Sequence, residues 1–307
     1  MNQTAKTFFD LQVNGYGGVD FNRDGLTGEQ LHEACRHLEA DGVGGILAAI
    51  ITDDVGRMAG RIAAIVRLRE RDELARRIIA GFHVEGPFLN ETAGFRGAHP
   101  VEEIRPADEG LMARLLEAGS GLVRVVTLAP ERDEGLKVTR MLARRGVLVS
   151  AGHCDPSLDQ LQAALDAGLS MFTHLGNGCP MQMHRHENII QRVLGLRGRL
   201  WVTFIGDGHH IPPYALGNYL RAAGLERTAV VTDGAAASGM GPGRYTLGRW
   251  EITIDQDRRA VAPDGSHLLG STATMPDCRR VLSDAVGLSE AETELLTAAN
   301  PRKAVGM

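Results

Sequence analysis

The sequence predicts a (β/α)₈ TIM barrel spanning its 307 residues. Two observations indicate this fold: eight short apolar runs of strand length recur along the chain, and helical patterns fill most of the gaps. A third observation is that polar residues end four of these runs. The carboxyl ends of parallel strands meet on the barrel face that carries the chemistry. No low-complexity linker divides the chain, so one domain over residues 1–307 is expected.

The predicted strands are rich in Val, Ile and Phe and stop at Gly or at polar residues. Amphipathic helical patterns lie between them, as in residues 28–42, 57–77 and 158–168. This alternation favours a closed parallel barrel over an open sheet. The strands are expected at residues 8–13, 45–51, 78–84, 122–128, 147–151, 170–174, 201–206 and 228–232.

One segment after the eighth predicted strand breaks the alternation. Residues 243–270 carry alternating apolar residues with polar turns at Asp255-Gln256-Asp257 and Asp264-Gly265. This pattern predicts a β-hairpin insertion before a last helix over residues 272–287. The hairpin either covers the mouth of the barrel or decorates its surface, and the sequence leaves both possibilities open.

Composition excludes several classes of function. A net charge of −5 gives no reason to expect nucleic acid or an anionic membrane as a partner. No stretch approaches the roughly 20 apolar residues of a membrane span, and the first residues lack the apolar run of a signal peptide. The four cysteines are scattered and form no CxxC pair, which is typical of reduced thiols. A cytoplasmic protein is therefore expected.

Four polar residues at strand ends form a candidate metal site. Glu85 follows the third predicted strand and His153 follows the fifth. His174 is the last residue of the sixth, and Asp233 follows the eighth. One carboxylate and two imidazoles make a three-ligand set that leaves a position for water, and a second carboxylate can shuttle protons. Each residue alone has an ordinary structural explanation. Their joint placement predicts a metal-dependent hydrolase.

A set of short motifs runs in order from Asp10 to Gly306: DLQVNGYGGVDFN, HVEGPFLN, GAHP, TLAPE, SAGHCD, THLGNGCP, GDGHH, VTDG, PGRYTLG, LLGSTATM and NPRKAVG. Through this ordered set the chain resembles the N-acetylglucosamine-6-phosphate deacetylases of the amidohydrolase superfamily. The resemblance implies hydrolysis of the acetamide of N-acetylglucosamine-6-phosphate, with glucosamine-6-phosphate and acetate as products.

The resemblance also implies roles for matching positions. Glu85, His153 and His174 would bind one divalent metal ion, zinc first, with Fe²⁺, Co²⁺ or Mn²⁺ as alternatives. Asp233 would be the general acid and base, and His99 would lie beside the acetamide. The further substrate contacts implied are Gly97, Ala98, Asn177, Gly178, Arg185 and His210.

Three departures from common patterns qualify these expectations. Gln12 and Asn14 stand where many amidohydrolases have His-x-His, and neutral amides are poor ligands for a second transition metal. The run 185–188 reads Arg-His-Glu-Asn where the family has Arg-Glu-Pro-Gly or close to it. The small β-sandwich domain usual in the family is expected to be absent, because the first predicted strand begins at residue 8 and the chain ends shortly after NPRKAVG.

The resemblance further implies a homodimer, in which Arg185 is donated across the interface. Two other functions remain open. The chain could deacetylate another N-acyl amino sugar, either N-acetylgalactosamine-6-phosphate or an unphosphorylated sugar. It could also be a sugar-binding barrel without activity, although such a protein has no reason to keep three metal ligands and a base together.

Overall fold

A computed structural model describes residues 7–261 and 268–307, and it has the predicted parallel barrel architecture. Eight strands follow one another around one sheet in chain order, each paired in parallel with the next. All lie at or next to their predicted positions. They are β1 (Phe8–Val13), β4 (Val43–Ile51), β5 (Ile79–Glu85), β6 (Val123–Leu128), β7 (Leu148–Ala151), β8 (Leu169–Phe172), β9 (Trp201–Ile205) and β10 (Thr228–Val231).

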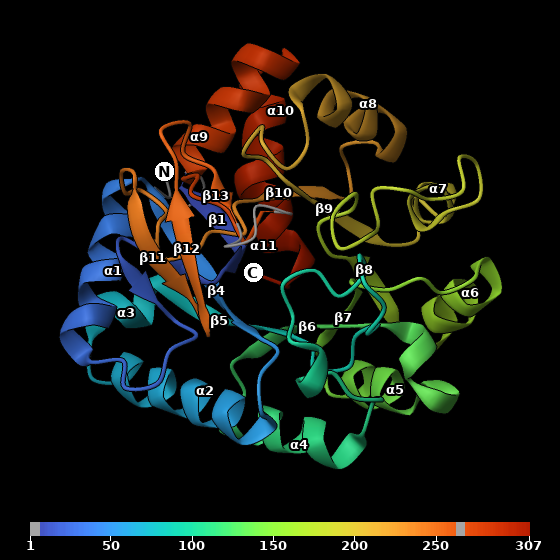
Figure 1. The fold of residues 1–307 in the computed structure, drawn as a ribbon, viewed down its shortest axis with the longest axis horizontal. Helices are drawn as coiled ribbons and strands as arrows, with labels where there is room; N and C mark the ends of the chain where they lie inside the picture. Colours follow the sequence, from blue (N-terminus) through green and yellow to red (C-terminus); the bar gives the residue numbers. More distant parts are fainter. Residues whose placement is uncertain (1–6, 262–267) are drawn as a thin grey trace.

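Helices surround the strands (Figure 1). Many begin at a side chain that accepts the hydrogen bond of a free backbone N–H, as Thr27 and Ser157 do in two capping boxes. The single helical pattern expected over 57–77 is two helices, because Asp72 caps a new one. The helices are α1 (Gly28–Ala40), α2 (Val55–Arg69), α3 (Glu73–Ile78), α4 (Glu109–Ala118), α5 (Lys137–Arg144), α6 (Leu158–Ala167), α7 (Ile189–Gly195), α8 (Pro213–Ala223), α9 (Met275–Arg280), α10 (Glu290–Glu294) and α11 (Asn300–Ala304). Among the described residues, none of these helices has the length and apolar character needed to cross a membrane.

The barrel closes between its first and last strands. Val13 forms a parallel bridge with Gly234, just beyond β10. Asp10 on β1 accepts hydrogen bonds from the backbone N–H and the hydroxyl of Thr232. Burial raises the pKa of Asp10 from 3.8 to about 7, although these hydrogen bonds oppose the shift. A buried carboxyl therefore joins the two strands at the closure.

The predicted insertion after the last barrel strand is present. It is an antiparallel sheet of β11 (Gly243–Leu247), β12 (Trp250–Ile254) and β13 (Ala260–Val261). The predicted turn at residues 255–257 lies between β12 and β13, whereas the predicted turn Asp264-Gly265 lies outside the described residues. Leu247 and Ile252 pack in one apolar cluster with Ile51 at the end of β4. The last predicted helix begins as α9 and continues as a π-helical segment, Val281–Val286.

Asp10→Asn is expected to stabilise the protein relative to wild type more at high pH than at low pH. A carboxyl whose pKa is raised on folding contributes stability at low pH, which is lost as pH rises through the folded-state pKa. The Asn side chain does not titrate, so the variant does not lose stability in this way as pH rises. Thermal unfolding of both proteins at about pH 5 and about pH 8 measures the effect. A variant-minus-wild-type difference in Tm that fails to rise with pH contradicts the expectation.

Candidate functional site

The four polar residues predicted at strand ends lie together at the carboxyl face of the barrel. Glu85 is the last residue of β5, and His153, His174 and Asp233 each come two residues after their strands. All four are buried. His153, His174 and Asp233 have φ angles of 51°, 36° and 50°, in the left-handed region that L-residues rarely adopt. Strained backbone of this kind concentrates at functional sites.

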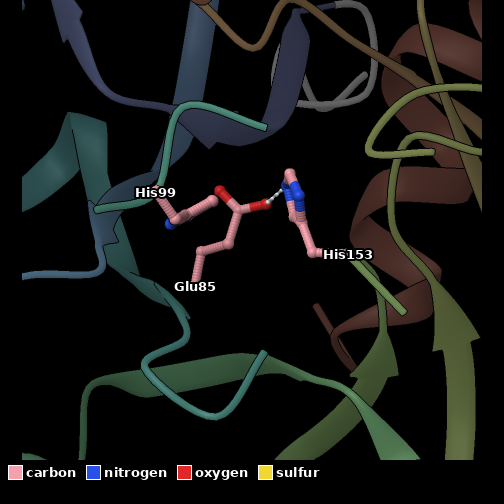
Figure 2. Close-up of side chains that lie close together, drawn as sticks. All are labelled: Glu85, His99 and His153. Atoms are coloured by element: carbon pink, nitrogen blue, oxygen red, sulfur yellow. Dashed lines mark ion pairs between the residues drawn. The ribbon is translucent and has the colours of Figure 1, made fainter. Parts of the chain in front are cut away.

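Two imidazoles converge on one carboxylate oxygen. Nε2 of His153 lies 3.1 Å, and Nε2 of His174 lies 2.9 Å, from Oε1 of Glu85. Figure 2 shows Glu85 close to His99 and His153, with its ion pair to His153 as a dashed line; the two rings meet edge to face, with 4.4 Å between their centroids. Burial alone would raise the pKa of Glu85, but hydrogen bonds from the two histidines and their charges hold it well below its usual range. The carboxylate is therefore ionised.

The donor set fits a divalent metal ion. Nδ1 of His153 lies 2.7 Å from the carbonyl of Phe95, which only accepts, so this nitrogen carries a proton. Without a metal, the contact with Glu85 requires a second proton, on Nε2; in the neutral ring Nε2 instead has a lone pair beside the carboxylate, which a cation between the two groups would bind. Ligand atoms held tetrahedrally by zinc lie roughly 3.3–3.5 Å apart, slightly farther than the 3.1 and 2.9 Å that separate Nε2 of His153 and Nε2 of His174 from Oε1 of Glu85. One ligand atom each from Glu85, His99 and His153 also lie within 4.8 Å of one another, so this buried group could hold a metal.

Thr52 controls the hydrogen-bonding state of His99. Its Oγ1 lies 2.8 Å from Nδ1 of His99 and 3.2 Å from the backbone carbonyl of Glu85. Burial, followed by the charge of His153, lowers the pKa of His99 to about 3, so the ring is neutral. If the Thr52 hydroxyl donates to His99, Nε2 carries the proton and can donate. If it donates to the Glu85 carbonyl instead, Nδ1 of His99 carries the proton, and Nε2 of His99 has a lone pair that can bind a metal.

Asp233 is held by two side-chain amides. Its Oδ1 accepts from Nε2 of Gln12 at 3.0 Å and from Nδ2 of Asn14 at 2.8 Å. The same Gln12 nitrogen lies 3.1 Å from Oε2 of Glu85, so it bridges the two carboxylates. Burial, followed by the charge of Glu85, raises the pKa of Asp233. A carboxyl with a raised pKa is suited to exchanging protons near neutral pH.

A cavity of about 1180 Å³ opens above these side chains. Leu247 on β11 and Arg259 in the loop before β13 contribute to its wall, so the insertion borders the site and is more than surface decoration. Arg185 does not line the cavity within this chain and lies exposed in the segment before α7. The other predicted site residues all line it: Glu85, Gly97, Ala98, His99, His153, His174, Asn177, Gly178, His210 and Asp233.

His210 forms an ion pair with Asp207. Both residues lie in the motif GDGHH, but Asp207 was not among the predicted site residues. Its Nδ1 lies 2.7 Å from Oδ2 of Asp207, whose other oxygen accepts the backbone N–H groups of His209 and His210. Burial opposes ionisation, yet the hydrogen bond from His210 brings the pKa of Asp207 down to about 2. Burial also opposes charge on His210, but Asp207 raises its pKa. The spacing of three residues between Asp207 and His210 was the available signal.

Two predicted substrate-binding glycines have a structural reason to be glycine. A Cβ at Gly178 would lie 2.8 Å from Nδ1 of His153, and one at Gly97 would lie 3.0 Å from its Cε1. Both glycines also have positive φ angles, 60° and 55°. Their backbones therefore pack directly against the ring of a candidate metal ligand as well as lining the cavity.

Comparison with known proteins shows the family to which the chain belongs. It is 31% identical over 304 residues to N-acetylglucosamine-6-phosphate deacetylase of Bacillus subtilis (strain 168), a match that covers 97% of this chain and 74% of that protein. The chain belongs to the N-acetylglucosamine-6-phosphate deacetylase family of the amidohydrolase superfamily. The family and enzyme class predicted from the sequence are thereby confirmed. No protein-family model matches the chain.

Other members of the family agree with this placement. N-acetylgalactosamine-6-phosphate deacetylase of Escherichia coli O157:H7 is 29% identical over 300 residues, with 98% of this chain and 77% of that protein covered. A mutant of the Mycobacterium smegmatis N-acetyl-D-glucosamine-6-phosphate deacetylase, solved in complex with N-acetyl-D-glucosamine-6-phosphate, superposes with a TM-score of 0.88 at 31% identity. That match covers 98% of this chain and 77% of the mycobacterial chain, and it confirms the barrel fold.

Gly178→Ala is expected to reduce metal affinity and activity by about 10- to 100-fold, the range seen when the support of a ligand is disturbed. The added methyl group must displace the ring of His153. Gly198→Ala is the matched control, because its φ is also positive (86°) but nothing lies within 4 Å of the added Cβ. The control should lose only about 1–2 kcal/mol of stability. Metal titration with activity assays checks both, and equal effects of the two variants would contradict this account.

Proposed function

We propose that the chain deacetylates an N-acetylated amino sugar 6-phosphate, with N-acetylglucosamine-6-phosphate as the first candidate and acetate as a product. The observation that carries the proposal is the convergence of His153 and His174 on ionised Glu85, with buried Asp233 bridged to it in the same cavity wall. The mycobacterial relative bound to N-acetyl-D-glucosamine-6-phosphate supports this substrate class.

One divalent metal ion is assigned to Glu85, His153 and His174, with zinc as the first choice and Fe²⁺, Co²⁺ or Mn²⁺ as alternatives. Such an ion lowers the pKa of water from 15.7 to about 7 and polarises an amide carbonyl. The chain supplies the orientation of the ligands: the Phe95 carbonyl fixes the tautomer of His153. Gln12 holds the second oxygen of Glu85 toward Asp233.

Asp233 serves as the proton carrier. Its carboxylate accepts a proton from the attacking water and returns it to the amide nitrogen, so that the amine can leave. Gln12 and Asn14 donate to one oxygen, Oδ1, and so fix the plane of the carboxylate. The buried position excludes bulk water from this exchange. General acid and base catalysis of this kind is worth about 10²–10⁴-fold in rate.

His99 faces the acetamide carbonyl and stabilises the negative charge that develops on its oxygen. This role requires a proton on Nε2, so the Thr52 hydroxyl must donate to Nδ1 of His99 at 2.8 Å instead of to the Glu85 carbonyl at 3.2 Å. A neutral ring suits the role, because a neutral donor stabilises the oxyanion without being drawn to the Glu85 carboxylate as a cation would be. The low pKa of His99 supports the neutral form.

The far end of the cavity is assigned to the sugar and its phosphate. Asn177, Gly178 and His210 contact them, and the hydrogen bond to Asp207 raises the pKa of His210, which favours its cationic form. Arg185, exposed in one chain, reaches the phosphate in the cavity of a second copy in a homodimer. N-acetylgalactosamine-6-phosphate remains the alternative substrate, because a relative of that specificity is nearly as similar to this chain.

Turnover on a panel of N-acetylated sugars tests the proposal. N-acetylglucosamine and N-acetylgalactosamine are each offered with and without a 6-phosphate. The phosphorylated sugars should be preferred, and Arg185→Ala should raise KM for them with a smaller change in kcat. The unphosphorylated sugars should scarcely respond to this substitution. Equal use of plain and phosphorylated sugars contradicts the phosphate assignment, and no acetate release from any of them contradicts the proposed function.

Asp233→Asn is expected to lower kcat by at least about 10²-fold while metal content and fold are kept. The substitution preserves the shape of the side chain but removes the proton acceptor. Steady-state kinetics at neutral pH, together with metal analysis of the same preparation, measures the effect. Turnover close to that of the wild type would mean that another group carries the proton.

A further inference from the structure

The turn of the inserted hairpin is anchored to the mouth of the barrel. Gly248 and Arg249 form the turn between the paired residues Leu247 and Trp250. The backbone N–H of Gly248 donates to Oδ2 of Asp20 at 2.8 Å. Arg249 extends from this anchored turn toward the end of β4, and Trp250 toward the loop that carries His99.

Three pairs of neighbouring residues, far apart in sequence, contact one another in a ring. One link joins Thr52 to His99, with 2.8 Å between Oγ1 and Nδ1. A second link joins the next residue, Asp53, to Arg249, whose guanidinium donates to Oδ1 at 2.8 Å. The third link closes the ring, because Nε1 of Trp250 donates to the carbonyl of Ala98 at 2.9 Å. The ring therefore ends on the backbone immediately before His99.

The loop that carries His99 depends on such external contacts. Residues 89–100 form turns but neither helix nor strand. Gly94 and Gly97 adopt φ angles of 93° and 55°. Because glycine accepts many backbone conformations, these two positions restrict the loop's conformation little by themselves. Within the loop, the backbone N–H of His99 donates to the carbonyl of Arg96. The hydrogen bond to the His99 ring itself comes from outside the loop, at Thr52.

Arg249 connects this loop to a buried charge. The side chain of Asp53 is only 4% exposed and also pairs with Arg61, at 2.9 Å. Burial opposes ionisation of Asp53, but its hydrogen bonds and the two guanidinium groups lower its pKa overall. Arg249 also pairs with Glu102 and Glu103, in the 3₁₀ turn Val101–Glu103 that follows His99. Arg249 thus joins the end of β4 to the segment just after the loop.

We propose that Arg249 and Trp250 are positioning residues that hold His99 against the substrate amide. Neither residue lines the cavity, so both act through the Ala98-His99 backbone and the segment beyond it. The inference rests on the proposed deacetylase function. It gives the inserted hairpin a catalytic purpose beyond forming part of the cavity wall.

Trp250→Phe keeps the aromatic packing and removes the N–H donor, and Arg249→Ala removes the ion pairs. Each should lower kcat by about 5- to 100-fold, with a smaller change in KM and unchanged metal content, because small displacements of a catalytic group carry costs of this order. Arg249→Lys should recover part of the loss. Arg244→Ala is the control, an exposed arginine on the same hairpin. Wild-type kcat in both Trp250→Phe and Arg249→Ala would overturn the inference.

A double-mutant cycle separates positioning from general stability. If Trp250 acts through His99, Trp250→Phe should cause no further loss of kcat in a His99→Ala background. Additive losses would overturn the inference. A second measurement does not need turnover: modification of His99 by diethyl pyrocarbonate, followed by mass spectrometry, should be faster in Trp250→Phe and Arg249→Ala than in Arg244→Ala. If the wild type hydrolyses no N-acetyl sugar, the proposed function is wrong. If His99 reacts no faster in Trp250→Phe and Arg249→Ala than in Arg244→Ala, the positioning role is wrong, whatever the outcome for the proposed function.

Discussion

A buried carboxylate shared by two imidazoles is the constraint on which the rest of the site depends. Glu85 is held ionised in the interior by Nε2 of His153 and His174, and such a charge is costly to bury without partners. The neighbouring groups are arranged around it. The Phe95 carbonyl fixes the tautomer of His153, and Gln12 donates to the second carboxylate oxygen while also holding Asp233. Most of the polar architecture at the barrel mouth serves this one charge.

The barrel makes this arrangement possible through its geometry. Parallel strands bring residues that are distant in the chain to one face, so Gln12 meets Asp233 although 221 positions separate them. The left-handed backbone at His153, His174 and Asp233 adds local strain at three strand ends. Segments without regular structure then require support from elsewhere, and the inserted hairpin supplies it at the loop carrying His99.

Much of this could be predicted from the sequence, because both the strands and the site follow local patterns. Apolar runs located the eight barrel strands, and the polar residue ending a run identified Glu85, His153, His174 and Asp233. The roles of Gln12 and Thr52 could not be predicted, because they arise from contacts between distant segments made only on folding, whereas the spacing of Asp207 and His210 was a local signal. The ring joining Thr52-Asp53, Ala98-His99 and Arg249-Trp250 combines three segments with no shared pattern. Arg185 is exposed in the chain, and the contact proposed for it lies in a second copy, which a pattern within one chain does not encode.

One metal ion is proposed to lie among Glu85, His153 and His174. Anomalous diffraction from crystals of protein prepared without chelator, with data collected on both sides of the zinc absorption edge, tests it most directly. We expect one strong peak in the anomalous difference density, about 2.0–2.2 Å from a carboxylate oxygen of Glu85 and from Nε2 of both histidines. A metal held instead by His99 with His174 uncoordinated, or fully active protein without any bound metal, would contradict it.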